Sequence, residues 1–303
     1  MRQARWCGAA LLIGACGPAR PAPIRIGVAY PRWARLHIAA AESTLRRTWG
    51  DSVALPEFVY DPDTTPERLE RTVEFAQQLA ADPRVSVIVG PSTSRAAIAV
   101  APVASAAGIP LVIPNATSRL LGASGPWVFR LVPNDSVEGA FLAEAVAARG
   151  LADRLLVLYT NDEYGQGLRA GVIEALAHRG QRPTAELPVT PGSDFATLLQ
   201  SEFAARPPRA ILAAVRNPEL VALLGALKAQ RRRVPVFSGD GGSSPLMVSE
   251  RVGALDFPVY SAAFAAPGGD SATATFARWW RGYAHQPLRP EDALTVDALV
   301  VAA

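Results

Sequence analysis

Short, continuous apolar runs alternate with amphipathic segments along the first half of the chain. The apolar runs are IRIGVAY at 24–30, VALPEFVY at 53–60, VSVIVG at 85–90, PLVIP at 110–114 and WVFRLVP at 127–133. Helical patterns lie between them, up to about residue 48, over 66–81 and over 92–107. Apolar runs without alternation are typical of parallel strands that helices cover on both faces. This half therefore predicts a doubly wound α/β unit.

The same alternation starts again after a helical pattern over 134–149. Apolar runs at 155–160, 185–189, 210–216 and 234–239 alternate with helical patterns over 165–179, 194–204 and 218–230, and a further helical pattern begins at Asp292. The second block has the period of the first, so the sequence predicts a second α/β unit rather than an extension of one sheet.

The N-terminal residues have the features of an export signal. Arg2 and Arg5 precede a short, uncharged and mostly apolar run that ends at Cys16. A membrane span needs about 20 apolar residues, so this run fits a signal peptide instead. The small residues before Cys16 resemble the bacterial lipobox, which predicts a signal peptide over 1–15, lipidation of Cys16 and a tether over 16–23. An ordinary signal peptide with an incidental cysteine is the alternative.

Charge and cysteine content narrow the class of protein. The net charge is +3, and Lys228 is the only lysine beside many arginines, most of them scattered. The run at 231–233 is interpreted as the solvated end of a helix, so no nucleic-acid partner is expected. Cys7 and Cys16 are the only cysteines. A chain cleaved before Cys16 has no internal disulfide. Its fold must then be held by hydrophobic cores, for which the apolar residues, 50% of the sequence, are sufficient.

Signatures of catalysis are missing from the sequence. It contains no G-x-S-x-G elbow, no H-E-x-x-H helix and no Walker-type glycine loop. Gly165, Gly167 and Gly171 do not have dinucleotide-binding spacing, and we interpret them as turn and helix-packing glycines. The three histidines lie far apart. We therefore expect no enzyme activity, no cofactor and no metal site.

Hydroxyl side chains follow two apolar runs. GPSTS at 90–94 and PNATS at 114–118 both fall where a strand gives way to the next segment. Ligand crevices lie at the carboxyl ends of parallel strands, and a helix start with nearby hydroxyls suits a carboxylate. Ser and Thr also cap helices with no ligand involved. Both interpretations stay open on the residues alone.

Several motifs in order resemble a known family. They are GPSTSRAAIAVAPVASAAGIPLVIPNATS at 90–118, GPWVFRLVPND at 125–135, LLVLYTNDEYGQGLRAGV at 155–172, PGSDFATLL at 191–199 and PVFSGDGGSS at 235–244. These stretches resemble the type I periplasmic binding proteins of the branched-chain amino-acid (leucine/isoleucine/valine) class. The resemblance implies two doubly wound, Rossmann-like α/β lobes that a hinge joins, closing over a small ligand like a Venus flytrap.

The resemblance also implies a domain plan and partners. Lobe 1 is expected over 24–131 plus 260–303 and lobe 2 over 132–259, with three crossovers between them. The family usually continues beyond Ala303, which predicts that lobe 1 is incomplete at its C-terminal end. The expected partners are the permease and ATPase subunits of an ABC importer. The expected place is the periplasm or the outer face of the cell envelope, with a lipid anchor in the membrane.

Site residues follow from the resemblance by position. Ser92, Thr93, Ser94, Asn115 and Thr117 are expected to hold the ligand α-carboxylate and part of its ammonium. Asp240 is expected to pair with the α-ammonium, and Tyr164 to close over the ligand from lobe 2.

This chain departs from the family pattern at the side-chain end of the pocket. A short basic stretch over 30–35 stands where the family has a glycine-rich loop, and Arg216 stands where an aromatic is common. Arg32, Trp33 and Arg216 are therefore expected to face a ligand that is acidic or larger than leucine. Solvated surface arginines are the alternative.

The leading functional hypothesis is a lipid-anchored binding protein of an ABC importer, taking an amino acid or related small carboxylate or amide. Two alternatives share the fold: a ligand-sensing receptor without transport, and a lipoprotein that activates cell-wall synthesis enzymes.

Overall fold

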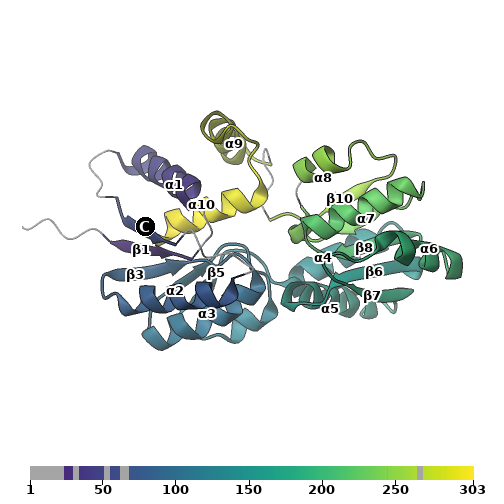
Figure 1. Cartoon of the computed structure of the whole chain (residues 1–303), viewed down its shortest axis with the longest axis horizontal. Helices are drawn as coiled ribbons and strands as arrows, with labels where there is room; N and C mark the ends of the chain where they lie inside the picture. Colours follow the sequence, from purple (N-terminus) through teal and green to yellow (C-terminus); the bar gives the residue numbers. More distant parts are fainter. Residues whose placement is uncertain (1–23, 30–33, 51–54, 62–67, 244, 265–268) are drawn as a thin grey trace, which may run out of the picture.

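The computed structural model describes residues 24–29, 34–50, 55–61, 68–243, 245–264 and 269–303. They form two lobes that lie side by side along the long axis of the molecule (Figure 1). Each lobe contains one five-stranded sheet, and every strand pairing in both sheets is parallel. The predicted fold class, two doubly wound α/β lobes, is confirmed.

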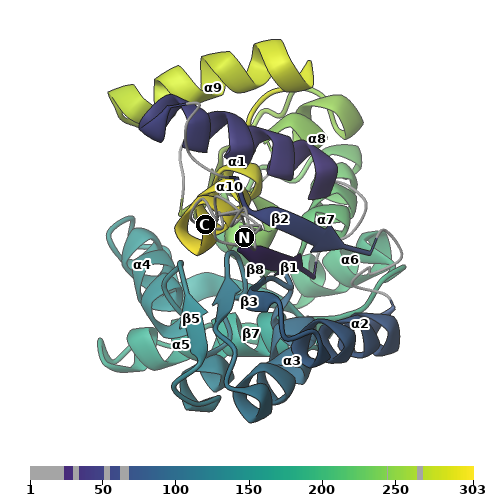
Figure 2. The ribbon, with the colours of Figure 1, turned by 90° about the vertical axis from the view of Figure 1, so that its left-hand side faces the viewer.

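Lobe 1 contains the sheet β2-β1-β3-β4-β5. Its strands are β1 (Arg25–Val28), β2 (Glu57–Tyr60), β3 (Val85–Val89), β4 (Leu111–Ile113) and β5 (Val128–Arg130). The helices are α1 (Ala34–Trp49), α2 (Leu69–Ala81), α3 (Ser94–Ala107), α9 (Ser271–Ala284) and α10 (Pro290–Ala302). Figure 2 shows α1, α9 and α10 on one side of this sheet and α2 and α3 on the other.

Lobe 2 contains the sheet β10-β9-β8-β6-β7. Its strands are β6 (Leu155–Thr160), β7 (Ala185–Val189), β8 (Ala210–Ala214), β9 (Val236–Ser238) and β10 (Val259–Ser261). The helices are α4 (Asp135–Ala147), α5 (Glu163–Ala177), α6 (Phe195–Ala205), α7 (Asn217–Ala229) and α8 (Pro245–Arg251). Numbered within its own lobe, each sheet has the order 2-1-3-4-5, so the two lobes repeat one topology.

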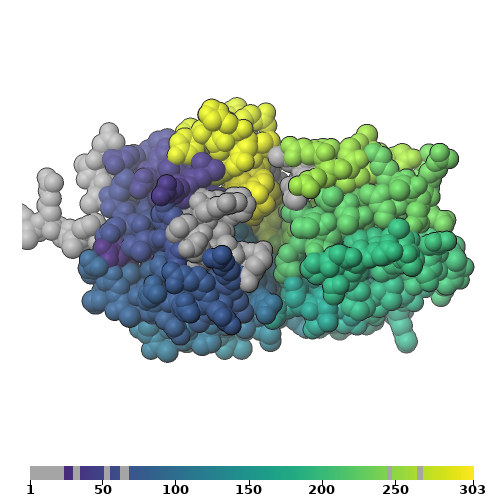
Figure 3. Space-filling model, viewed as in Figure 1, coloured from purple at the N-terminus to yellow at the C-terminus, as the bar shows by residue number. Residues whose placement is uncertain are grey.

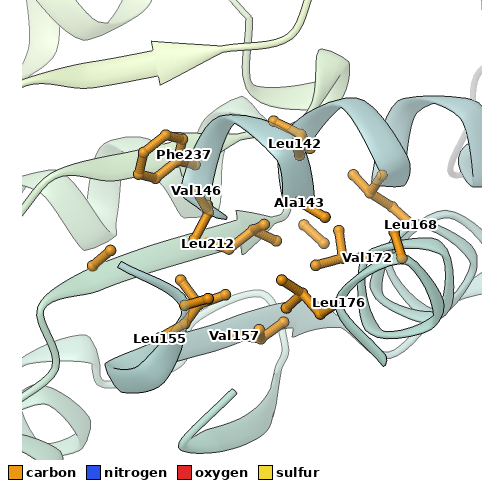
Figure 4. Packing of buried hydrophobic residues seen from close by; sticks show 14 of the residues in the cluster. Leu142, Ala143, Val146, Leu155, Val157, Leu168, Val172, Leu176, Leu212 and Phe237 are labelled. Atoms are coloured by element: carbon orange, nitrogen blue, oxygen red, sulfur yellow. The ribbon is translucent and has the colours of Figure 1, made fainter. Parts of the chain in front are cut away.

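Each sheet separates two hydrophobic cores, because its strands are apolar on both faces. In lobe 2, α4 and α5 bury Leu142, Val146, Leu168 and Val172 against one face of the sheet (Figure 4). The other face packs against α6 and α7 through a second apolar cluster. Lobe 1 has the same arrangement with its own two clusters. Each lobe therefore has the cores needed to fold as a unit.

The chain passes from lobe 1 to lobe 2 over 131–134, and after β10 of lobe 2 the next described helix, α9, belongs to lobe 1. β10 (Val259–Ser261) pairs with β9, so the expected domain boundary at 260 falls inside a strand of the second sheet. No helix among the described residues is long and apolar enough to span a membrane.

The glycines of α5 pack tightly, as the sequence predicted. A Cβ on Gly165 would lie 2.2 Å from the Thr160 carbonyl oxygen, and one on Gly171 would lie 2.3 Å from the Asp135 carbonyl oxygen. Backbone approaches this close leave no room for a side chain. The interpretation of these residues as turn and helix-packing glycines is confirmed.

A buried ionic contact joins the first and last helices of lobe 1. Asp292 of α10 is 1% exposed, accepts hydrogen bonds from Arg289 and lies 2.9 Å from His37 Nε2. Burial alone raises the pKa of this carboxyl, but hydrogen bonds from Arg289 and His37 outweigh it and lower the pKa to about 2. His37 thus connects α1 to α10.

Candidate ligand-binding site

The two lobes meet at the carboxyl ends of their strands. In lobe 1, β3 and β4 end just before the two hydroxyl-bearing junctions. In lobe 2, β6, β8 and β9 end just before Asp162, Arg216 and Asp240. Figure 3 shows the surface hollowed where the C-terminal segment of lobe 1 faces lobe 2. Open parallel sheets bind ligands at this edge, so the boundary is the candidate site.

The first hydroxyl junction is built around the start of α3. Thr93 caps the helix by accepting a hydrogen bond from the Ala96 N–H at 3.4 Å. Ser94 is 3% exposed and accepts from the Ser118 N–H at 3.2 Å, which fixes the two junctions together. Ser92 is half-buried beside them. Thr93 therefore caps α3, and Ser94 links the two junctions. Each hydroxyl accepts a hydrogen bond and can still donate its own proton.

The second junction holds one buried oxygen that lacks a partner. Thr117 is 1% exposed, and its hydroxyl lies against the buried Asp135 carboxyl, to which it can donate. Asn115 donates from Nδ2 to Thr295 Oγ1 at 3.4 Å, whereas its buried Oδ1 is unpaired within the same part of the chain. Buried polar atoms are nearly always paired, so each one left over points to a missing partner.

Lobe 2 contributes a compact group made of Tyr164, Asp240 and Glu138. Tyr164 is 5% exposed, and its hydroxyl accepts from the Gly241 N–H at 2.9 Å. Glu138 is 2% exposed, and its Oε1 accepts from the Asp240 N–H at 2.7 Å. The Tyr164 hydroxyl donates to the Asp240 carboxyl, and the Glu138 and Asp240 side chains lie within hydrogen-bond reach of each other. The buried atoms Asp240 Oδ1 and Glu138 Oε2 receive no further hydrogen bond from the described residues.

Burial sets the charge of this group. It raises the pKa of Asp240 to about 6. It also raises the pKa of Glu138 to about 9, with a further contribution from the nearby Asp240 charge. For Tyr164, burial and the charges of Asp240 and Glu138 raise the pKa well above its ordinary value. At neutral pH the Glu138 carboxyl is therefore protonated, and Asp240 carries most of the negative charge.

Asp135 connects the two halves of the site. Its backbone N–H donates to the Thr117 carbonyl oxygen at 2.9 Å across the crossover. Its side chain is fully buried, and burial raises its pKa to about 6, although Thr117 and the charges of Arg130 and Arg119 act in the opposite direction. The Asp135 charge also raises the pKa values of Glu138 and Asp240. Asp135 thus interacts both with Thr117 of lobe 1 and with the buried carboxyls of lobe 2.

Arg216 follows β8 in lobe 2 and is already paired. It forms an ion pair with Asp162, and its guanidinium carbon lies 5.2 Å from the centre of the Tyr164 ring. Burial raises the pKa of Asp162, but hydrogen bonds from the Gly165 N–H and the Arg216 charge outweigh it and lower that pKa below its ordinary value. The positive charge of Arg216 is therefore balanced, although the side chain still lies beside the predicted site residue Tyr164.

Some predicted residues lie outside the described part of the chain. Trp33, Arg32 and the lipidation site Cys16 are among them. Of the rest, the structure brings Ser92, Thr93, Ser94 and Thr117 together at one edge of lobe 1, with Asn115 beside them. It brings Tyr164 and Asp240 together in lobe 2, and Arg216 next to Tyr164.

Sequence reasoning missed Glu138 and Asp135. Both lie in the first turn of α4 and are as buried as Leu142 and Val146 further along the helix. Their spacing at 135, 138, 142 and 146 is that of one helix face, so two acids continue a buried apolar stripe. That placement was the available signal. Among the described residues, no group of three or more metal-binding side chains could hold a metal ion.

Two doubly wound lobes, with unpaired buried polar groups where their strands end, define a two-lobed solute-binding protein. The sequence model of the family described as periplasmic binding protein matches residues 58–300, and the chain belongs to this family. The predicted resemblance is thereby confirmed. The family consists of solute-binding proteins rather than enzymes, and its name implies an extracytoplasmic location.

Solved structures share the fold over most of the chain. An ABC transporter substrate-binding protein of Desulfitobacterium hafniense in complex with Leu has a TM-score of 0.76 at 23% identity, covering 92% of this chain and 82% of that chain. The branched-chain amino acid binding protein LivJ of Streptococcus pneumoniae with isoleucine has a TM-score of 0.78 at 20% identity, covering 92% of this chain and 82% of that chain. A solute-binding protein of Rhodopseudomonas palustris with 3,4-dihydroxybenzoic acid has a TM-score of 0.76 at 18% identity, covering 91% of this chain and 78% of that chain.

One curated relative matches a smaller part of the chain. The uncharacterized protein MJ1266 of Methanocaldococcus jannaschii is 29% identical over 100 residues, which cover 31% of this chain and 24% of that protein. The match spans about a quarter of the length of that curated relative and gives no further information on the ligand.

Proposed function

We propose that this chain is the extracytoplasmic solute-binding component of an ABC importer and binds an α-amino acid or a close zwitterionic analogue between its lobes. Its partners would be the permease and ATPase subunits of that importer. One observation supports the choice of ligand: lobe 1 has a buried, unpaired oxygen of Asn115, and lobe 2 has the buried carboxyls of Asp240 and Glu138, which have no cationic partner among the described residues.

The charge of the site favours a ligand that carries a cationic nitrogen. Related structures hold leucine or isoleucine in some cases and 3,4-dihydroxybenzoic acid in another. The aromatic acid has no ammonium to balance a buried carboxylate, and like charges at short range repel strongly where water is excluded. An α-ammonium on Asp240, with the α-carboxylate on the hydroxyls of lobe 1 and the start of α3, satisfies the Asp240 charge and those donors. The Asn115 Oδ1 oxygen is an acceptor, so it suits a donor of the same ammonium rather than the carboxylate.

A thermal-shift screen tests this proposal. The panel contains the twenty standard L-amino acids, among them leucine and glutamate, together with 3,4-dihydroxybenzoate. A ligand at about 100 times its Kd stabilises the folded state by about 2.7 kcal/mol, which raises the Tm of a chain this long by about 5 °C. We expect such a rise with at least one amino acid and none with the benzoate. A response to amine-free acids alone would overturn the proposal, and glutamate tests the hypothesis of an acidic ligand at Arg216.

We also propose that the protein is attached to the membrane through a lipid on Cys16. The motif that supports this lies before the described residues. Mass spectrometry of the mature N-terminal peptide should show a diacylated cysteine as its first residue, and Cys16→Ser should release the protein into the soluble fraction. An unmodified, internal Cys16 in the exported protein would refute the anchor.

A further inference from the structure

Glu138 places a second carboxyl group against Asp240. Glu138 projects from α4, Asp240 follows β9, and the 2.7 Å hydrogen bond from the Asp240 N–H to Glu138 Oε1 holds the two together. That bond uses one oxygen of Glu138. The buried atoms Glu138 Oε2 and Asp240 Oδ1 receive no hydrogen bond from any other described group, so in the empty site the two carboxyls have the proton of Glu138 between them.

Close packing at Gly239 holds the turn that carries Asp240 against α4 and α5. A Cβ on Gly239 would lie 2.3 Å from Leu168 Cδ2, 2.6 Å from the Tyr164 hydroxyl and 3.0 Å from Glu138 Oε1. The turn after β9 therefore packs directly against both helices. A built site of this kind is preorganised for a small group with several hydrogen-bond donors.

A primary ammonium fits the two buried oxygens. It has three N–H donors and one positive charge, so it can donate to Asp240 Oδ1 and to Glu138 Oε2 and keep a donor for a third acceptor. We propose that Glu138 and Asp240 together bind the primary ammonium group of the ligand, and that Glu138 gives up a proton to solvent when this happens. The inference rests on the proposed function, because it concerns the ammonium of the same ligand.

The proton balance follows from the state of the empty site. Burial and the Asp240 charge raise the pKa of Glu138 to about 9, so near pH 7 or 8 this carboxyl starts protonated. A bound ammonium favours the carboxylate form and lowers that pKa. The protonated Glu138 and the free ammonium thus become an ammonium–carboxylate pair plus one proton in solvent. The affinity must then rise with pH below about 9, by up to about tenfold per pH unit.

Several charged and titratable groups surround the Glu138–Asp240 pair. Asp135 on α4 adds negative charge, and Tyr164 on α5 presents its hydroxyl. The guanidinium of Arg130 acts on Asp135, whereas Arg216 lies over the Tyr164 ring and pairs with Asp162. Since Asp135 and Asp240 have pKa values of about 6, both are ionised at pH 8. Glu138 is then the group that can release a proton.

Isothermal titration calorimetry tests the inference. The probe is whichever of the twenty L-amino acids gives the largest thermal shift with the wild-type protein. Titrations at pH 8 in phosphate and in Tris, two buffers with different ionisation heats, give the number of protons released on binding. We expect close to one proton for wild type and close to none for Glu138→Gln. Glu144→Gln is the matched control, because Glu144 lies on the same helix and its side chain is 58% exposed.

The outcomes separate this inference from the proposed function. A response to no amino acid defeats the proposed function itself. Amino-acid binding by wild type without proton release, or with a pH-independent Kd between pH 7 and 8, overturns the role of Glu138 alone. Equal proton release by Glu138→Gln and wild type also overturns it. The wild-type titrations decide the matter even if Glu138→Gln does not fold.

Discussion

At the scale of single residues, one missing methyl group allows α4 to lie against α5. A Cβ on Gly139 would stand 2.5 Å from the Gly171 carbonyl carbon and 2.5 Å from the Val172 nitrogen. Both are backbone atoms of α5, so no side-chain rotation can relieve the overlap. The helices would have to move apart, and Glu138 next to this position would move with α4.

We predict that Gly139→Ala lowers the free energy of unfolding by about 1–3 kcal/mol, the usual cost of overpacking a tight interior. Gly225→Ala on α7 is the control, because a Cβ there has nothing within 4 Å. It should leave stability unchanged or raise it by about 0.5–1 kcal/mol, since alanine suits a helix better than glycine. Urea denaturation measures both. Equal stabilities of the two variants would show that α4 and α5 are not held at this distance.

At the scale of elements, α4 shows why sequence patterns find a helix more easily than its buried face. The helix was predicted over 134–149 and spans Asp135–Ala147. Its apolar Val137 and Phe141 are 58% and 65% exposed, whereas the acids Asp135 and Glu138 are buried. The stripe with Val137 and Phe141 is the more apolar at the start of the helix, so hydropathy favours the wrong face. Glu138 lies on the buried face of α4, where a charged residue is not expected from the sequence.

Other elements differ in how clearly their residues mark them. β6 was predicted with its observed bounds because it is an unbroken apolar run, five of whose six residues are buried. β7 was also predicted near its observed bounds, although it contains Glu186 and Pro188 and only Val189 is buried. β10 was missed, since its three residues are mostly exposed at the edge of the sheet. α9 was missed although Phe276, Trp279, Trp280 and Tyr283 repeat at helical spacing, and only Trp280 is fully buried. Their contacts to α1 become visible only in the fold, as with Trp279 under Arg47.

At the scale of the whole molecule, few described contacts hold the lobes together apart from the crossovers. Arg119 of lobe 1 pairs with Glu174 of α5, and both side chains are about half exposed. Such a pair contributes little to stability. The ordered motifs predicted that two lobes exist, but the relative position of the lobes depends on such weak contacts, which no motif encodes. A ligand that bridges the lobes can therefore shift their arrangement at small cost.

We predict that the radius of gyration, measured by small-angle X-ray scattering, falls when the probe amino acid saturates the protein. The reason is that the ligand can contact both lobes only when they are close: its α-carboxylate then reaches Thr117 in lobe 1 while its ammonium reaches Asp240 in lobe 2. Asp240→Asn keeps the shape of the side chain but removes its charge, so at the same amino-acid concentration its radius should stay at the ligand-free value. If wild type binds the amino acid with no change in radius, one lobe alone holds the ligand. The proposed sharing of the zwitterion between the lobes would then be wrong, although the assignment of Glu138 and Asp240 to the ammonium could still stand on the calorimetry.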